Sequence, residues 1–186
     1  MNTMLEAFKT RAEAVSAQVE QVAGKEQALQ CIAALLLQEG VSSQPGSHAV
    51  WAGSRMMTPE DRKNMASAVP GIRFDVTREL AAEARVGISQ MDWAVANTGT
   101  LVQDAVAVEQ RLVSTLPPVH IAVVATSSLL PDLPALLARV DPKKTAYLAF
   151  ITGPSRTADI ERVLTIGVHG PGKLIIVMVD DLEVAS

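Results

Sequence analysis

The chain carries VHIAVVA at residues 119–125, AYLAFIT at 146–152 and LIIVMVD at 174–180, three apolar runs of strand length. Helical patterns at 129–140 and 155–166 separate these runs, and such alternation predicts consecutive βαβ crossovers with parallel strands. Because the runs are apolar almost throughout, the sheet is expected to be covered on both faces. The predicted fold class is therefore α/β, with a mostly parallel sheet in a three-layer α/β/α arrangement.

The first forty residues are expected to form an N-terminal helical segment, ahead of an α/β domain at residues 41–186. Apolar residues spaced by three or four predict one helix over residues 1–22, ended by Gly24, and a second helix over 25–38. Three roles remain open for this segment: a cover for the domain, an arm, or a contact between two copies in a homo-oligomer.

The middle of the chain has weaker patterns. Thr58 followed by Pro59 is a good helix start, and that helix is expected to end before Pro70. Thr77 is a candidate cap for a further helix through residue 85. Short strands are expected at residues 49–52, 86–88 and 93–96.

Composition excludes several classes of protein. The 186 residues include 16 Lys+Arg and 20 Asp+Glu, and the net charge of −4 leaves no positive surplus for a nucleic-acid partner. Cys31 is the one cysteine, so the chain alone cannot form a disulfide or a four-cysteine zinc or iron–sulfur site. No spacing of His, Asp or Glu indicates a metal site, and no cofactor is expected. The sequence shows neither a targeting signal nor an apolar run of membrane length, which predicts a cytoplasmic protein.

Two loops that follow apolar runs carry candidate ligand-binding residues, because ligands of open parallel sheets bind outside the carboxyl ends of the strands. The first is the turn Thr98-Gly99-Thr100, where a glycine and two hydroxyls suit an anion-binding nest. The second follows the run at 146–152, where the start of the predicted helix offers free N–H groups to an anion. Its candidate residues are Gly153, Ser155, Arg156, Thr157 and Asp159. Arg156 adds a planar guanidinium suited to phosphate or carboxylate. The alternative is a tight turn in the first loop and ordinary helix capping in the second.

His169 is a further candidate, held between Gly167 and the Gly-Pro-Gly of residues 170–172. An imidazole there can bind an anion or move a proton near neutral pH. It precedes the third run, so a plain crossover places it at the opposite end of the sheet from Ser155. This separation argues against a triad of Ser155, His169 and Asp159, and a helix-ending turn is the alternative interpretation.

Three motifs in this order resemble the LUD-domain family: Thr98-Gly99-Thr100, ITGPSRTADI at 151–160 and GVHGP at 167–171. The resemblance implies the fold of the NagB/RpiA/CoA-transferase-like superfamily. It also implies a role in bacterial oxidation of L-lactate to pyruvate, beside two cysteine-rich iron–sulfur partner proteins. Members of this type carry no cluster of their own, in agreement with the single cysteine. Asn97 departs from the family pattern, in which a glutamate often precedes Thr-Gly-Thr, and an amide cannot ionise to act as acid, base or nucleophile.

Two functions follow from these observations. In the first, the chain is a component of an L-lactate utilization system that binds a small anionic ligand or a partner, beside iron–sulfur subunits. In the second, it is a stand-alone enzyme that acts as a CoA transferase, a sugar-phosphate isomerase or a folate cyclo-ligase. A scaffold whose loops are only structural caps is a third interpretation. The sequence favours the first and leaves open whether the chain catalyses a reaction by itself.

Overall fold

A computed structural model describes residues 3–141, 143–158 and 164–182. Within these ranges, six strands form a central sheet in which every pairing is parallel. In spatial order the strands are β1 (Gln18–Gly24), β12 (Lys173–Asp181), β7 (Val119–Ala125), β4 (Val86–Gln90), β2 (Ala49–Trp51) and β3 (Ile72–Arg73). Because the strands run the same way, their carboxyl ends all lie along one edge of the sheet.

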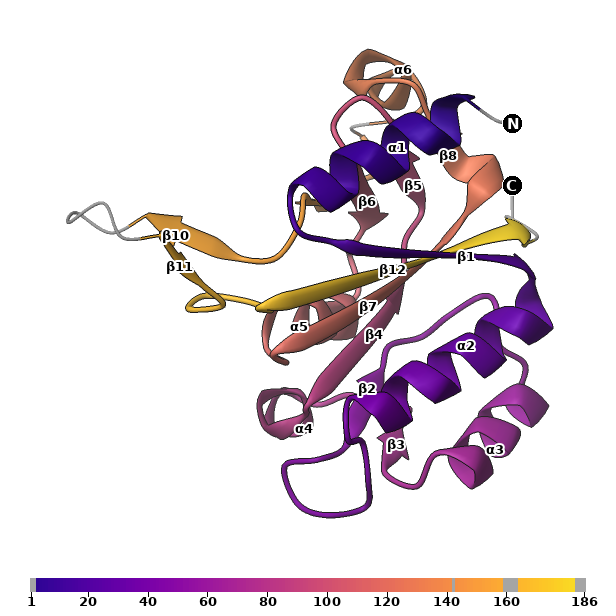
Figure 1. The fold of residues 1–186 in the computed structure, drawn as a ribbon, viewed down its shortest axis with the longest axis vertical. Helices are drawn as coiled ribbons and strands as arrows, with labels where there is room; N and C mark the ends of the chain where they lie inside the picture. The colour runs from indigo at the N-terminus through magenta and orange to yellow at the C-terminus, as the bar shows by residue number, and fades with distance from the viewer. Residues whose placement is uncertain (1–2, 142, 159–163, 183–186) are drawn as a thin grey trace.

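Helices cover both faces of this sheet, as the apolar character of its strands requires. One face carries α2 (Lys25–Gln38) and α3 (Pro59–Ala68). The opposite face carries α1 (Thr3–Ala14), α4 (Arg78–Glu83) and α5 (Val108–Thr115). Figure 1 shows α1 and α2 on opposite sides of β1 and β12. Among the helices that the structure describes, none has the length and apolar character needed to cross a bilayer.

A second sheet lies on the α1 side of the first and shares a buried apolar cluster with it. In spatial order its described strands are β8 (Leu129–Leu130), β5 (Trp93–Val95), β6 (Thr100–Asp104) and β9 (Leu148–Ile151). Strand β6 pairs antiparallel with both β5 and β9. The 3₁₀ helix η1 (Thr126–Ser128) leads from β7 into β8, and α6 (Leu133–Leu137) follows β8.

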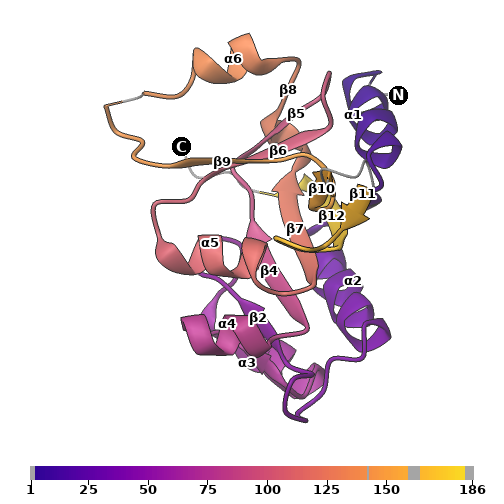
Figure 2. The same cartoon turned by 90° about the vertical axis from the view of Figure 1, so that its left-hand side faces the viewer.

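An antiparallel hairpin of β10 (Arg156–Ala158) and β11 (Leu164–Ile166) follows the second sheet. It projects from the body of the molecule in Figure 1, and Figure 2 shows β9 leading into it. After the hairpin the chain returns to the central sheet as β12. The hairpin therefore connects the edge of the second sheet to the middle of the first.

The predicted α/β class with a mostly parallel sheet is confirmed, as are several local predictions. The helix at 25–38 and the strands at 119–125 and 174–180 are present. Thr58 begins α3 with a capping box, in which its hydroxyl accepts the N–H of Asp61 at 3.2 Å and its own N–H donates to the Asp61 carboxylate at 2.7 Å. Thr77 caps α4 by accepting the N–H of Leu80.

The single helix predicted over residues 1–22 is wrong beyond Ala14. Ser16 adopts a φ of +71°, a left-handed conformation that ends α1, and the N–H of Ala17 donates to the Ala12 carbonyl at 3.0 Å. The chain then becomes β1, an edge strand that pairs with β12. The helical spacing of apolar residues continued into β1 by coincidence, because local periodicity does not register a distant strand partner.

The helix predicted over residues 155–166 is also wrong, since this segment contains β10 and β11. Their register pairs Arg156 with Ile166, and the N–H of Ser155 donates to the Pro171 carbonyl at 2.8 Å. Ser155 is therefore not a helix cap with a free N–H group. The helix predicted over 129–140 shrinks to α6, because Pro131 holds the residue before it extended, in β8.

The predicted succession of βαβ crossovers is wrong because the run at 146–152 joins the second sheet. It forms β9, where Phe150 is exposed and the other residues are half-buried. Strands β7 and β12 are buried almost throughout and pair directly with each other. Partial exposure suits the edge of a small sheet, whereas near-complete burial suits the centre of a covered one.

Asp61 makes part of the stability dependent on pH. The Lys25 ammonium at 2.6 Å, with the Thr58 N–H and hydroxyl, lowers the pKa of Asp61 from 3.8 to about 2. A lowered folded-state pKa contributes stability that is present above pH 3.8 and is lost as the pH falls through about 2. In urea titrations, the stability difference between the wild type and Asp61→Asn should therefore shrink from about pH 5 to about pH 2. A difference that stays constant would contradict this role.

Candidate functional site

A cleft of about 460 Å³ lies where β2 and β4 end, and we call it the carboxyl-end cleft. Gly53 and Arg55 follow β2, Gln90 ends β4, and Asp104 ends β6 of the second sheet. The lining residues are Gly53, Arg55, Gln90, Asp92, Asp104, Val106, Ala107 and Gln110. In open parallel sheets, ligands bind at this edge.

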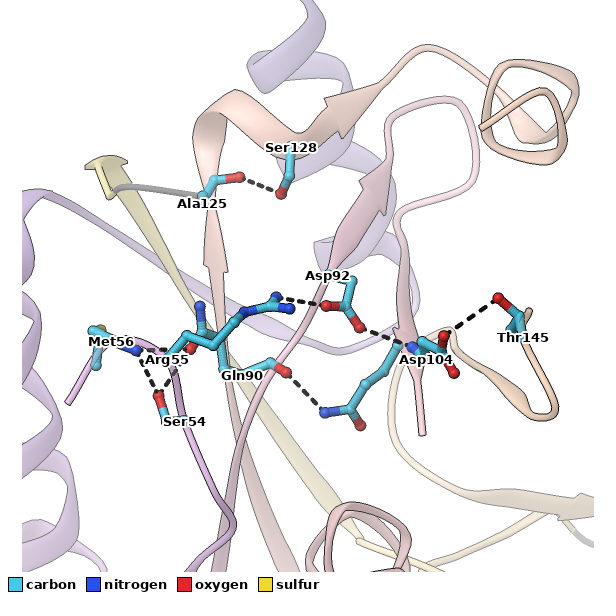
Figure 3. A network of polar contacts seen from close by, with 10 residues as sticks. Ser54, Arg55, Met56, Gln90, Asp92, Asp104, Ala125, Ser128 and Thr145 are labelled. Atoms are coloured by element: carbon cyan, nitrogen blue, oxygen red, sulfur yellow. Dashed lines mark hydrogen bonds and ion pairs between the residues drawn. The ribbon is translucent and has the colours of Figure 1, made fainter. Parts of the chain in front are cut away.

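An ion pair holds Arg55, which lines the carboxyl-end cleft. Nη2 of Arg55 lies 2.6 Å from Oδ1 of Asp92, and Oδ2 of Asp92 accepts the N–H of Asp104 at 2.8 Å (Figure 3). The Asp92 side chain is 15% exposed, whereas that of Arg55 is 51% exposed. The carboxylate thus anchors one nitrogen of the guanidinium and leaves its other N–H groups for an anion in the cleft.

Gln90 ties the loop after β2 to both sheets. Its side-chain oxygen accepts the Ser54 hydroxyl at 2.8 Å and the Met56 N–H at 3.1 Å. Its backbone carbonyl accepts the side-chain amide of Gln103 at 2.8 Å. Figure 3 shows Ser54, Met56 and Gln90 beside the Arg55–Asp92 pair. These bonds fix the loop that carries Arg55.

Asp104 brings a buried acceptor to the cleft. Its Oδ1 has no hydrogen-bond partner among the described residues, while its Oδ2 accepts a long bond of 3.3 Å from the Thr145 hydroxyl. A buried polar atom without a partner is destabilising by roughly 1–3 kcal/mol, so such an atom in a cleft favours a ligand or a water that donates to it.

The Thr98-Gly99-Thr100 turn lies away from this cleft, against the end of α1. Gly99 has a φ of +66°, and a Cβ built on it would lie 2.4 Å from the backbone nitrogen of Ala12. The Thr100 hydroxyl bonds to the hydroxyls of Thr98 and Thr152, both at 2.8 Å. The turn and the end of β9 therefore form one hydroxyl cluster.

Gly153 and Arg156 hold the connection between α1 and β1. A Cβ on Gly153, where φ is +73°, would lie 2.5 Å from the Val15 carbonyl oxygen. Nη2 of Arg156 donates to that same carbonyl at 2.8 Å and to the Ser16 hydroxyl at 2.9 Å. Within the part of the chain that the structure describes, the Arg156 guanidinium is thus hydrogen-bonded to neutral groups.

Ser155 and His169 lie on one groove of about 350 Å³, which we call the amino-end groove because it lies where β7 and β12 begin. The predicted separation of these two residues is wrong, because the β10–β11 hairpin brings the chain back to its own start. The N–H of Gly167 donates to the Ser155 carbonyl at 2.9 Å. Thr157 lies on β10 opposite Thr165. Asp159 lies outside the described residues.

The LUD domain family model matches residues 5–179, which is nearly the whole chain. The chain belongs to the LUD domain family. This LUD domain is similar to lactate utilization protein C of Exiguobacterium sp. (strain ATCC BAA-1283 / AT1b), at 40% identity over 58% of the chain and 50% of the relative. It is also similar to lactate utilization protein C of Geobacillus sp. (strain WCH70), at 37% identity over 55% of the chain and 45% of the relative. The chain thus spans about half the length of the curated relatives it matches.

A solved structure supports the fold of this LUD domain. A DUF162 family protein from Deinococcus radiodurans superposes with a TM-score of 0.64 over 95% of the chain and 96% of that structure. The identity of the pair is 20%, so the comparison concerns architecture alone.

The carboxyl-end cleft of this LUD domain was missed by the sequence analysis. Arg55, Gln90, Asp92 and Asp104 are scattered along the chain and form no motif. The sequence contained one indication of the cleft, because Gln90 and Asp92 lie in the short segment after the strand expected at residues 86–88. Among the described residues, no three His, Cys, Asp or Glu side chains are grouped as a metal site would require.

Proposed function

We propose that this LUD domain takes part in L-lactate utilization by binding a small 2-hydroxycarboxylate in the carboxyl-end cleft. Two of its relatives, at 40% and 37% identity, are named lactate utilization protein C. The observation that carries the proposal is a partly exposed guanidinium in the same cleft as a buried, unpartnered carboxylate oxygen.

Arg55 supplies the group that binds the carboxylate of the ligand. Its geometry is set by the 2.6 Å contact with Asp92 and by the loop that Gln90 holds. Less conformational entropy is then lost on binding, because the guanidinium is already held in place. A carboxylate accepts well from a guanidinium, since charge-assisted hydrogen bonds are about twice as strong as neutral ones.

Asp104 supplies selectivity for a hydroxyl group. Its unpartnered Oδ1 accepts the hydroxyl hydrogen of a 2-hydroxycarboxylate, whereas a simple carboxylate leaves that oxygen unsatisfied. A ligand without a hydroxyl also brings its negative charge toward Asp92 and Asp104 with no compensating bond. The cleft therefore favours L-lactate over propionate.

In this proposal, the oxidation of L-lactate requires partner proteins that accept its electrons. Conversion of lactate to pyruvate releases two electrons and two protons, and the single cysteine of this chain cannot hold an iron–sulfur cluster alone. We place the electron transfer in iron–sulfur subunits and the recognition of the hydroxy acid in this LUD domain. The stand-alone enzyme remains the alternative prediction.

Calorimetric titration with L-lactate and with propionate tests the proposal. Arg55→Ala should weaken L-lactate binding about 10- to 100-fold, the loss expected for a hydrogen-bonded charge. Asp104→Asn should lower the ratio of L-lactate affinity to propionate affinity, because it removes the charged acceptor of the hydroxyl and also the negative charge that disfavours propionate.

Arg139→Ala is the matched control, because Arg139 is exposed and lies outside the cleft. L-lactate binding that is equal in the wild type and in Arg55→Ala would overturn the assignment of the cleft. Growth on L-lactate after deletion of the gene tests the role in the pathway separately, and normal growth without a second lactate oxidase would contradict it.

A further inference from the structure

The amino-end groove is a second concave site, at the opposite edge of the central sheet from the carboxyl-end cleft. It is lined by the start of β7, the start of β12, the end of β9 and the loop before β12. Its lining includes no aspartate or glutamate among the described residues, whereas Asp92 and Asp104 line the cleft. In a chain with a net charge of −4, a groove whose described lining residues are positive or neutral favours an anion.

His120 gives the groove a buried polar atom. The residue is 1% exposed, and its Nε2 bonds to the Ser89 hydroxyl at 2.8 Å. His120 is one of the residues that line the groove, and Nε2 is the nitrogen that bonds Ser89, so Nδ1 is the nitrogen left for an occupant. Burial lowers the pKa of His120 to about 4, which keeps the ring neutral near pH 7. An anion would select the tautomer that carries hydrogen on Nδ1 and leaves Nε2 to accept the Ser89 hydroxyl hydrogen.

Arg156 and His169 add cationic and hydrogen-bonding groups to the lining. Both hydrogens of Arg156 Nη2 are used by Val15 and Ser16, which orients the guanidinium, and Nε and Nη1 have no partner among the described residues. His169 is exposed on the loop that closes against Ser155. A Cβ on Gly170 would lie 3.1 Å from the Ser155 Cβ, so this loop packs directly on Ser155.

We infer that the amino-end groove binds the phosphate group of a small phosphorylated molecule, through Arg156, His169, Ser155 and His120. A phosphate offers several acceptor oxygens to the guanidinium, imidazole and hydroxyl donors of the groove. The volume of about 350 Å³ is at the small end for a ligand pocket, so it suits a phosphate that bears only a few carbon atoms. The carboxyl-end cleft suits a phosphate less well, because the carboxylates of Asp92 and Asp104 repel a dianion.

Titration with inorganic phosphate and with glycerol 3-phosphate tests this site, with glycerol as the phosphate-free reference. Nitrogen-15 NMR of the imidazoles should show His120 and His169 shifting with phosphate, while His48 stays unchanged because its Nε2 is paired with the Leu80 carbonyl elsewhere. Arg156→Gln and His169→Gln should each weaken phosphate binding at least about 10-fold, as expected for the loss of a hydrogen bond to a charged group. His169 is exposed, so His169→Gln is expected to fold even where a buried variant would not.

Arg55→Gln separates this site from the carboxyl-end cleft and should leave phosphate binding unchanged. Loss of phosphate binding in Arg55→Gln, together with no loss in Arg156→Gln, would overturn the inference and place phosphate in the cleft. Imidazole signals that do not move with phosphate, or that move equally with chloride at the same ionic strength, would also overturn it. None of these outcomes depends on whether L-lactate binds to the cleft.

Discussion

Replacing Gly99 with alanine should lower the free energy of unfolding by more than about 3 kcal/mol. The left-handed φ of +66° alone disfavours alanine by roughly 1–2 kcal/mol. The added Cβ would also lie 2.4 Å from the backbone nitrogen of Ala12, so α1 must move away from the turn. Displacement of α1 loosens the apolar cluster that it shares with both sheets. Urea unfolding followed by circular dichroism measures the loss.

Gly46→Ala is the matched control for this change. Gly46 has a similar φ of +74°, but a Cβ built there meets nothing within 4 Å. Gly46→Ala should therefore lower the free energy of unfolding by only about 1–2 kcal/mol, the cost of placing alanine in a left-handed conformation. If Gly99→Ala and Gly46→Ala lower the free energy of unfolding equally, the close approach of Ala12 to Gly99 does not contribute to the effect.

Replacing Phe8 with alanine should lower the free energy of unfolding by about 3–5 kcal/mol, the range for a large aromatic removed from a core. Phe8 is fully buried on α1 and belongs to the cluster that includes strands of both sheets. The cavity would lie where α1 contacts those strands, so the Gly99 turn should also become less ordered. Hydrogen exchange of the Gly99 amide, which donates to Val95 at 3.0 Å, reports on that turn.

Leu37→Ala on α2 is the corresponding control, since Leu37 is 54% exposed. Its effect should remain within about 0.5 kcal/mol. A small effect of Phe8→Ala would mean that α1 is a detachable arm, one of the three roles the sequence left open, and would contradict its position as a cover.

Local chemistry made part of the fold predictable. The capping box of α3 depends on Thr58 and Asp61 alone, and β7 and β12 are recognisable because burial on both faces requires apolar residues throughout. Elements that depend on distant partners were not predictable in this way. Strands β1, β10 and β11 lie in stretches of sequence with apolar residues at helical spacing, and only pairing with another strand selects their extended form.

In the candidate sites, too, residues in local motifs were predictable, whereas residues brought together by the fold were not. Motifs predicted the groove residues Ser155, Arg156 and His169, because glycine and proline around reactive side chains are visible in a sequence. The run at 146–152 belongs to the second sheet, so its carboxyl end does not lie at the edge of the central sheet where β2 and β4 end. Arg55 and Asp104 become neighbours only when both sheets are in place.

The pairing of β1 with β12, and of β12 with β7, has a consequence for synthesis in the cell. Register places Gln18 beside Ile175, so β1 gains its neighbour only after residue 175 has left the ribosome. Until then the nascent chain exposes the open sides of β1 and β7, which are prone to pair with other chains. Translation arrested before residue 173 should yield chains that chaperones retain, whereas synthesis through β12 should allow the central sheet to form.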